Sequence, residues 1–120
     1  MDFYTTWCGP CTRDFPTVKL VHDAMGQRGV TVIAVHDNSS SHKAIREHAR
    51  QKSMDMPIVV DHEDGRILKA WESLGLVRGY PSYVLIDPNG RLLASDATVP
   101  GPLLRVYKVE IVRQHLLKLR

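Results

Sequence analysis

Two cysteines three positions apart are the residues of this 120-residue chain best suited to carry out chemistry. They lie in the segment Trp7-Cys8-Gly9-Pro10-Cys11, and the sequence contains no third cysteine. A permanent disulfide between them would close a very small loop and remove little entropy from the unfolded chain. The spacing therefore favours reversible thiol–disulfide chemistry over a structural cross-link.

Two other chemistries could use these cysteines. A structural zinc site needs four ligands, but there is no second cysteine pair and the six histidines are dispersed, so we predict no metal. Peroxidase sites of the peroxiredoxin type carry a threonine three residues before the reactive cysteine, as Thr5 precedes Cys8 here. They also carry a proline four residues before that threonine, where this chain has Met1. Peroxide reduction is kept as an alternative function.

The surrounding pattern predicts that the cysteines lie at a strand-to-helix junction. Residues 3–5 resemble the end of a buried strand, which Gly9-Pro10 stops. Unpaired N–H groups and the dipole at the start of the following helix would stabilise a thiolate on Cys8, which we predict to be the nucleophile. Cys11, one turn further in and less accessible, is predicted to be the resolving thiol. The helix itself is indicated by apolar residues at helical spacing: Phe15, Val18, Val21 and Met25.

The rest of the chain predicts a mixed sheet with helices. Residues 30–35 form a continuous apolar run typical of a parallel strand covered on both faces. Residues 82–86 and 91–95, joined by Asp87-Pro88-Asn89-Gly90, predict an antiparallel hairpin. Together the elements predict a single α/β domain over residues 1–120. The remaining elements are a helix from the N-cap Ser41 to about Lys52, an extended segment at 57–60, a short helix carrying Ile67, Leu68, Trp71 and Leu74 and closed by Gly75, and a last helix from about Pro102.

Composition excludes several classes of protein. With 43% hydrophobic and 24% charged residues, the chain is neither disordered nor built of membrane spans. The net charge of +3 comes from scattered basic residues, so no nucleic-acid partner is predicted. No apolar run approaches the roughly 20 residues of a transmembrane helix. Met1 is followed at once by Asp2-Phe3-Tyr4, which is not the pattern of a secretory signal.

Three further motifs accompany the cysteines: Phe15-Pro16, Gly79-Tyr80-Pro81-Ser82 and Leu85-Ile86-Asp87-Pro88-Asn89-Gly90. With them the chain resembles the thioredoxin superfamily, and within it the redoxin domains of the TlpA and ResA type. The resemblance implies a thioredoxin-like three-layer α/β/α fold with a central mixed sheet. It also implies a thiol–disulfide oxidoreductase that reduces protein disulfides, is regenerated by an upstream thiol reductant, and needs no cofactor beyond the Cys8–Cys11 disulfide. A non-catalytic thioredoxin-fold module that only docks a partner is the alternative from another class.

The resemblance implies a set of substrate-binding residues. Pro81 matches the proline that follows a cis peptide bond beside the cysteines, and Tyr80 would present backbone groups to a substrate strand. Trp7 is expected to pack beside the nucleophile and restrict access to it. Gly9 and Pro10, between the cysteines, resemble the pair found in the reducing members.

Two aspartates are expected to move protons. Asp2 matches a buried carboxylate, six residues before the first cysteine, that thioredoxins use to exchange protons with the resolving thiol. Burial without a cation would raise its pKa towards neutrality. Asp14 matches an acidic position near the disulfide of ResA-like proteins. The alternatives are a solvated terminus for Asp2 and a solvated helix surface for Asp14; the histidines, including His36, are expected to be surface or structural.

The N-terminal region departs from the family pattern. In TlpA-type relatives the strand before the cysteines is longer and follows another strand or hairpin, whereas few residues precede Trp7 here. We therefore expect either a missing N-terminal segment or stabilisation by another chain. Membrane anchoring, if any, would lie in that segment. By resemblance the location is the cell envelope or periplasm, with the cytoplasm as the alternative.

Overall fold

The strand that leads to the cysteines, β1 (Asp2–Tyr4), lies at the centre of a five-stranded mixed sheet in the computed structural model, which describes residues 1–96. β1 is parallel to β2 (Ala34–His36), and β2 is parallel to β3 (Ile58–Val60). On its other side β1 is antiparallel to β4 (Ser82–Ile86), which forms a hairpin with the edge strand β5 (Leu92–Ser95). The residues that follow β1 therefore leave the sheet at the C-terminal end of its central strand.

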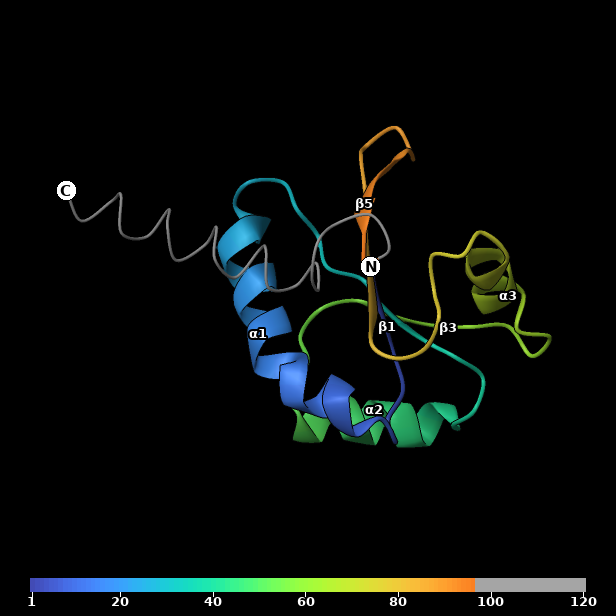
Figure 1. The fold of residues 1–120 in the computed structure, drawn as a ribbon. Helices are drawn as coiled ribbons and strands as arrows, with labels where there is room; N and C mark the ends of the chain where they lie inside the picture. Colours follow the sequence, from blue (N-terminus) through green and yellow to red (C-terminus); the bar gives the residue numbers. More distant parts are fainter. Residues whose placement is uncertain (97–120) are drawn as a thin grey trace.

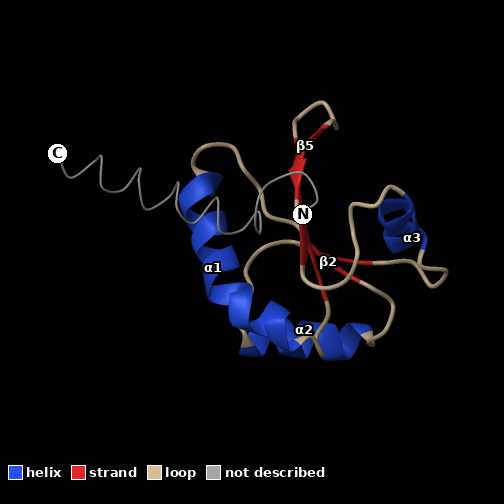
Figure 2. Ribbon diagram, in the orientation of Figure 1, coloured by secondary structure: helices blue, strands red, loops and turns tan. Residues whose placement is uncertain are grey.

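Helices lie on both sides of this sheet (Figures 1 and 2). Side chains alternate between the two faces of a strand, so Tyr4 and Phe3 point in opposite directions. Tyr4 packs with residues of α1 (Gly9–Gly26), and its ring stacks on a histidine of α2 (His42–Gln51). Phe3 packs with residues of α3 (Arg66–Ser73). The described residues thus form the predicted three-layer α/β/α arrangement.

Helix α1 forms where the apolar spacing predicts it. Its buried residues, Cys11, Phe15, Val18 and Val21, lie on one stripe that faces the sheet. The helix ends at Gly26, and Gly29 just beyond it has a φ of 82°, a left-handed conformation that glycine adopts without strain. Burial of this stripe holds the helix whose first turn carries both cysteines.

Helix α2 begins at the predicted cap. The Ser41 hydroxyl oxygen accepts a hydrogen bond from the Ala44 amide at 3.1 Å. Ile45 is the buried residue of this helix, which agrees with its thin apolar stripe.

Helix α3 is capped from the preceding loop. The buried Asp61 carboxylate accepts hydrogen bonds from the amides of Ile67 and Leu68, each at 3.0 Å. Trp71 is partly buried and packs against the cluster that contains Phe3. Leu74, predicted on the same apolar stripe, instead lies just past the helix end and is 68% exposed.

Other boundaries also differ from the sequence prediction. β2 begins at Ala34 rather than at residue 30, because β1 and β3 supply only three partner positions each. β5 begins at Leu92, one residue later than predicted. The last predicted helix, from about Pro102, falls in 97–120, outside the described residues, so the single-domain assignment stays a prediction. Within residues 1–96 no helix has the length and apolar character needed to span a membrane.

Candidate active site

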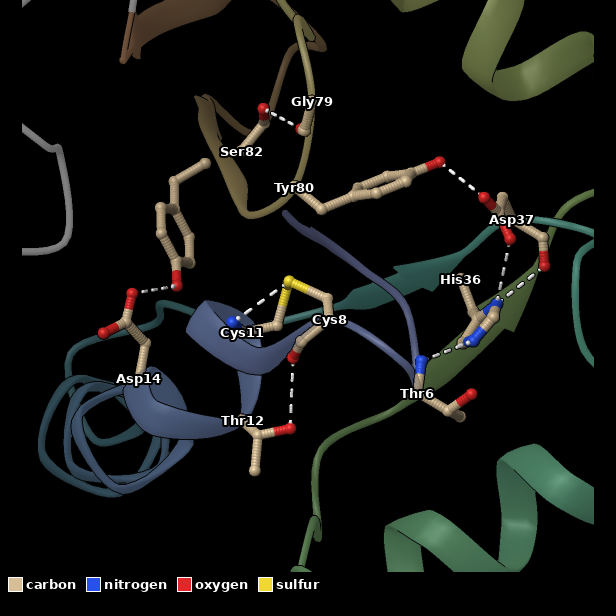
Figure 3. The surroundings of a disulfide bond; sticks show 11 residues. Thr6, Cys8, Cys11, Thr12, Asp14, His36, Asp37, Gly79, Tyr80 and Ser82 are labelled. Atoms are coloured by element: carbon tan, nitrogen blue, oxygen red, sulfur yellow. Dashed lines mark hydrogen bonds and ion pairs between the residues drawn. A yellow bond between two sulfur atoms is a disulfide. The ribbon is translucent and has the colours of Figure 1, made fainter.

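The two cysteines form a disulfide at the N-terminus of α1 (Figure 3). Cys8 is the N-cap residue, and its sulfur accepts a hydrogen bond from the Cys11 amide at 3.1 Å. Gly9 and Pro10 are the first two residues of the helix and are exposed, whereas Cys8 is 6% exposed and Cys11 only 1% exposed. In the reduced protein the same amide and the helix dipole would stabilise a thiolate on Cys8 more than on Cys11.

The loop before β4 lies beside this disulfide. The Tyr80–Pro81 peptide bond is cis, which confirms the cis bond before Pro81 that the family resemblance implies. Tyr80 packs against the hydrophobic cluster that contains both cysteines. The structure therefore brings together the cysteine motif and the proline motif, which are about 70 residues apart in the sequence.

Trp7 lies at the rim of the site. Its side chain is 63% exposed, and its indole N–H donates a hydrogen bond to the Ser39 hydroxyl at 2.8 Å. The Trp7 ring meets the Tyr80 ring edge to face, with centroids 6.0 Å apart. The exposed Trp7 and the half-buried Tyr80 thus lie next to a buried disulfide.

Asp2 is buried beneath the site. It is 2% exposed, so the alternative of a solvated terminus is wrong. Alternation along β1 places it on the same face as Tyr4, the face covered by α1. Neither carboxyl oxygen has a hydrogen-bond partner among the described residues. Burial raises the pKa of Asp2 to about 7; the nearby terminal ammonium opposes this rise, and the charges of Asp14 and Asp96 add to it.

Asp14 reaches the same region through a tyrosine that the sequence analysis did not single out. The Tyr83 hydroxyl donates to the Asp14 carboxylate at 3.5 Å, the bond drawn at Asp14 in Figure 3. Tyr83 also lies directly opposite Asp2 in the β1–β4 ladder. Burial raises the pKa of Tyr83 well above its ordinary value, and the negative charges of Asp2, Asp14 and Asp96 add smaller contributions in the same direction. The Tyr83 hydroxyl therefore stays protonated and donates its hydrogen to Asp14.

His36 holds the segment before the cysteines. It is fully buried, and its Nε2 accepts a hydrogen bond from the Thr6 amide at 2.9 Å. Nε2 is therefore unprotonated, and Nδ1 carries the hydrogen that it donates to the Asp37 carbonyl at 2.7 Å. The structural role expected for His36 is confirmed.

A third aspartate, absent from the sequence prediction, binds Tyr80. The Tyr80 hydroxyl donates to Asp37 Oδ2 at 2.7 Å (Figure 3). Asp37 lies in the loop between β2 and α2, far from Tyr80 in the sequence. Only the pairing of β1 with both β2 and β4 brings the two residues together.

One group of possible metal ligands occurs among residues 1–96, namely His22, Asp23 and Asp55. The Lys19 ammonium is ion-paired with both carboxylates, at 3.6 Å from Asp23 and 2.9 Å from Asp55. A cation is thus already provided by the protein. No cysteine belongs to this group.

Curated relatives that match include bacterial proteins named thiol–disulfide oxidoreductase. ResA of Bacillus thuringiensis subsp. konkukian is 27% identical over 93 residues, which are 78% of this chain and 50% of the relative. ResA of Geobacillus thermodenitrificans is 28% identical over 116 residues, 97% of this chain and 59% of the relative. The chain thus spans about half the length of these relatives, and they bear out the resemblance to the ResA type.

Comparison with solved structures identifies the fold of this chain, and a match to a family model identifies its family. The thioredoxin domain of a thiol–disulfide oxidoreductase from Bacteroides vulgatus aligns with a TM-score of 0.72 at 20% identity, over 92% of this chain and 76% of that one. StoA from Bacillus subtilis aligns with a TM-score of 0.68 at 21% identity, over 89% and 77%. These likenesses establish a thioredoxin-like fold. Because the AhpC/TSA family model matches residues 1–95, which include every site residue described above, the chain belongs to the AhpC/TSA family.

Proposed function

We propose that this chain is a thiol–disulfide oxidoreductase that reduces protein disulfides through Cys8 and Cys11. The observation that carries the proposal is the Cys8–Cys11 disulfide at the N-terminus of α1, with Cys8 as N-cap and the Tyr80–Pro81 bond beside it. This arrangement gives one sulfur a stabilised thiolate and leaves the other within bonding distance of it. The oxidoreductase names of the relatives agree with this assignment.

The reaction takes two exchange steps. The Cys8 thiolate attacks one sulfur of the substrate disulfide, so that a Cys8–substrate disulfide forms and the other substrate sulfur leaves as a thiolate. Cys11, as a thiolate, then attacks the Cys8 sulfur, which forms the Cys8–Cys11 disulfide and releases the second substrate thiolate. Two electrons pass to the substrate in the cycle. A thiol reductant restores the two cysteines by the same steps in reverse.

The buried acids would handle the protons of the second step. Asp2 lies on the face of the sheet where Cys11 is packed, and its pKa near 7 lets it accept and return a proton at neutral pH. Asp14 is linked to this region through the Tyr83 hydroxyl. We assign Asp2 as the base for Cys11 and Asp14 as a secondary relay.

The proposed partners are protein disulfides and an upstream thiol reductant. Trp7, Gly9, Pro10, Tyr80 and Pro81 would form the surface that receives the substrate chain. The proposed location is the cell envelope, in keeping with one structural neighbour described as a secreted disulfide oxidoreductase of Mycobacterium tuberculosis.

The first experiment is an equilibrium titration of free thiols in defined thiol–disulfide buffers. A midpoint potential near that of thioredoxin, about −270 mV, would support a reductant, and one near −120 mV would indicate an oxidant. Absence of a reversible couple would overturn the proposal in favour of a docking module.

Cysteine variants test the order of attack. We expect Cys8→Ser to abolish insulin-disulfide reduction and Cys11→Ser to accumulate a mixed disulfide with the substrate, detectable by mass under non-reducing conditions. Hydrogen peroxide consumption by the wild-type chain, measured in parallel, distinguishes the peroxidase alternative. Peroxide turnover without insulin reduction would contradict the assignment.

A further inference from the structure

The residue before Cys8 and the residue before Pro81 are joined by a closed ring of contacts. The Trp7 indole N–H donates to the Ser39 hydroxyl at 2.8 Å, and that hydroxyl donates to Asp37 Oδ1. The other Asp37 oxygen accepts the Tyr80 hydroxyl at 2.7 Å. The Tyr80 ring then meets the Trp7 ring edge to face, which closes the ring.

Asp37 is the member of this ring on which the others depend. Both of its carboxylate oxygens accept hydrogen bonds. Oδ2 accepts the Tyr80 hydroxyl, and Oδ1 accepts the Ser39 hydroxyl and, at 2.9 Å, the Ser39 amide. Its side chain is 14% exposed, and its charge-assisted bond to Tyr80 is partly buried, whereas its bonds to Ser39 lie at the exposed surface. Burial alone would raise the pKa of Asp37, but the hydrogen bonds from Ser39 and Tyr80 hold it below its usual range. Asp37 is therefore a carboxylate at neutral pH.

The ring fixes a side chain where a substrate would lie. Tyr80 has only two side-chain torsions, and the bond to Asp37 ties the far end of its ring to the loop after β2, as Figure 3 shows. Trp7, 63% exposed, is tied to the same loop through Ser39. The two rings thus form a fixed aromatic wall, and ordering this wall beforehand lowers the entropy that binding would otherwise cost.

We propose that Asp37 is a positioning residue that sets substrate specificity, by holding Tyr80 and Trp7 as a wall that favours disulfides within extended peptide chains over small disulfides. The inference rests on the proposed function, since it concerns how that site selects its substrate. A small disulfide can reach Cys8 without placing a peptide chain along the wall. Loss of the Asp37 bonds should therefore affect peptide-chain substrates more.

The test compares the wild-type chain with Asp37→Ala, Tyr80→Phe and the double variant. For each, kcat and KM are measured with insulin as the protein disulfide and with 5,5′-dithiobis(2-nitrobenzoate) as the small one. Tyr80→Phe removes one charge-assisted hydrogen bond and should lower the ratio of the two kcat/KM values about tenfold, mainly through a higher KM for insulin. Asp37→Ala removes that bond and both bonds from Ser39, so it should lower the ratio at least as far. The double variant should fall no further than Asp37→Ala, because Asp37→Ala already removes the bond that Tyr80→Phe loses.

Glu63→Ala is the matched control, because Glu63 is an exposed carboxylate whose side chain touches none of the four ring residues. Its ratio should equal that of the wild type. Tyr80→Phe keeps the ring and fills the same space, so it tests the bond even if Asp37→Ala folds poorly. If the wild type turns over both disulfides and Tyr80→Phe leaves the ratio unchanged, this inference is overturned while the proposed function stands. Additive losses in the double variant would have the same consequence. Failure of the wild type to turn over either disulfide would overturn the proposed function, and this inference with it.

Discussion

Asp2 and Tyr83 lie directly opposite each other in the β1–β4 ladder, and both are buried on the face of the sheet that α1 covers. The Tyr83 hydroxyl bonds to Asp14, while the Asp2 carboxyl group has no hydrogen-bond partner among residues 1–96. An acid buried in this way is more stable protonated than ionised. Asp2 therefore changes charge close to neutral pH, which makes its role measurable.

The first prediction concerns the pH dependence of catalysis. If Asp2 is the base for Cys11, the resolution step should speed up as pH rises through about 7, where Asp2 loses its proton. Asp2→Asn should remove this inflection and slow resolution at pH 8 about 100-fold, the usual scale of a general-base contribution. Stopped-flow release of substrate from the Cys8 mixed disulfide, from pH 5.5 to 8.5, measures both effects. Retention of the inflection in Asp2→Asn would remove Asp2 from the mechanism.

The second prediction concerns stability and has the opposite pH trend. The folded pKa of Asp2, about 7, is above its ordinary value of 3.8, so the folded state binds the proton more tightly. Stability linked to Asp2 is therefore fully present below pH 3.8 and is lost as pH rises to about 7. Asp2→Asn should stabilise the oxidised protein at pH 8 by up to about 4 kcal/mol and change it little at low pH.

Urea unfolding at pH 4 and pH 8 measures this effect, with Glu63→Gln as an exposed control that should change neither value. A destabilised Asp2→Asn protein at pH 8 would show that the carboxylate has a stabilising partner.

The third prediction tests the hydrogen bonds of His36. His36→Leu keeps a similar volume but leaves the Thr6 amide and the Asp37 carbonyl without their partners. Two unpaired polar groups at a buried site should cost about 3 kcal/mol of unfolding free energy. Urea unfolding measures it, and the same substitution at the exposed His42 provides the control. Equal effects at the two positions would mean that the His36 bonds contribute nothing to stability.

The fourth prediction tests the cap of α3. Asp61→Ala removes the acceptor of the Ile67 and Leu68 amides and should destabilise the protein by about 2 kcal/mol. Amide hydrogen exchange should show the largest loss of protection in α3, because the cap acts locally. Glu63→Ala, two residues away and exposed, should leave exchange unchanged. Uniform loss of protection across the sheet would contradict a local cap.

Features encoded by neighbouring residues could be predicted from the sequence. The apolar spacing of Phe15, Val18 and Val21 was enough to locate α1, and Ser41 was enough to locate the start of α2. The family resemblance was enough to predict the cis peptide bond before Pro81 and the burial of Asp2. In each case the signal lies within a few residues or in a family motif.

Features that depend on distant residues could not be predicted. Nothing near Asp37 indicates that it meets Tyr80, because the contact exists only once β2, β1 and β4 are paired. Tyr83 was assigned to a strand correctly, but its bond to Asp14 follows from register. The start of β2 was missed because partner strands, and not local apolar character, decide where a ladder begins.

The pairing of β1 with β4 also dictates when the site can exist during folding. Asp2 pairs with Tyr83, so this ladder closes a loop of about 80 residues, and contacts of such long range form late. α1 can acquire its helical turns earlier, with Cys8 and Cys11 already in the chain but without Tyr80, Pro81 or Tyr83 against them. During synthesis the thiols would thus be open to non-native partners until β4 has emerged and joined the sheet, and the proposed selective exchange would begin only after closure.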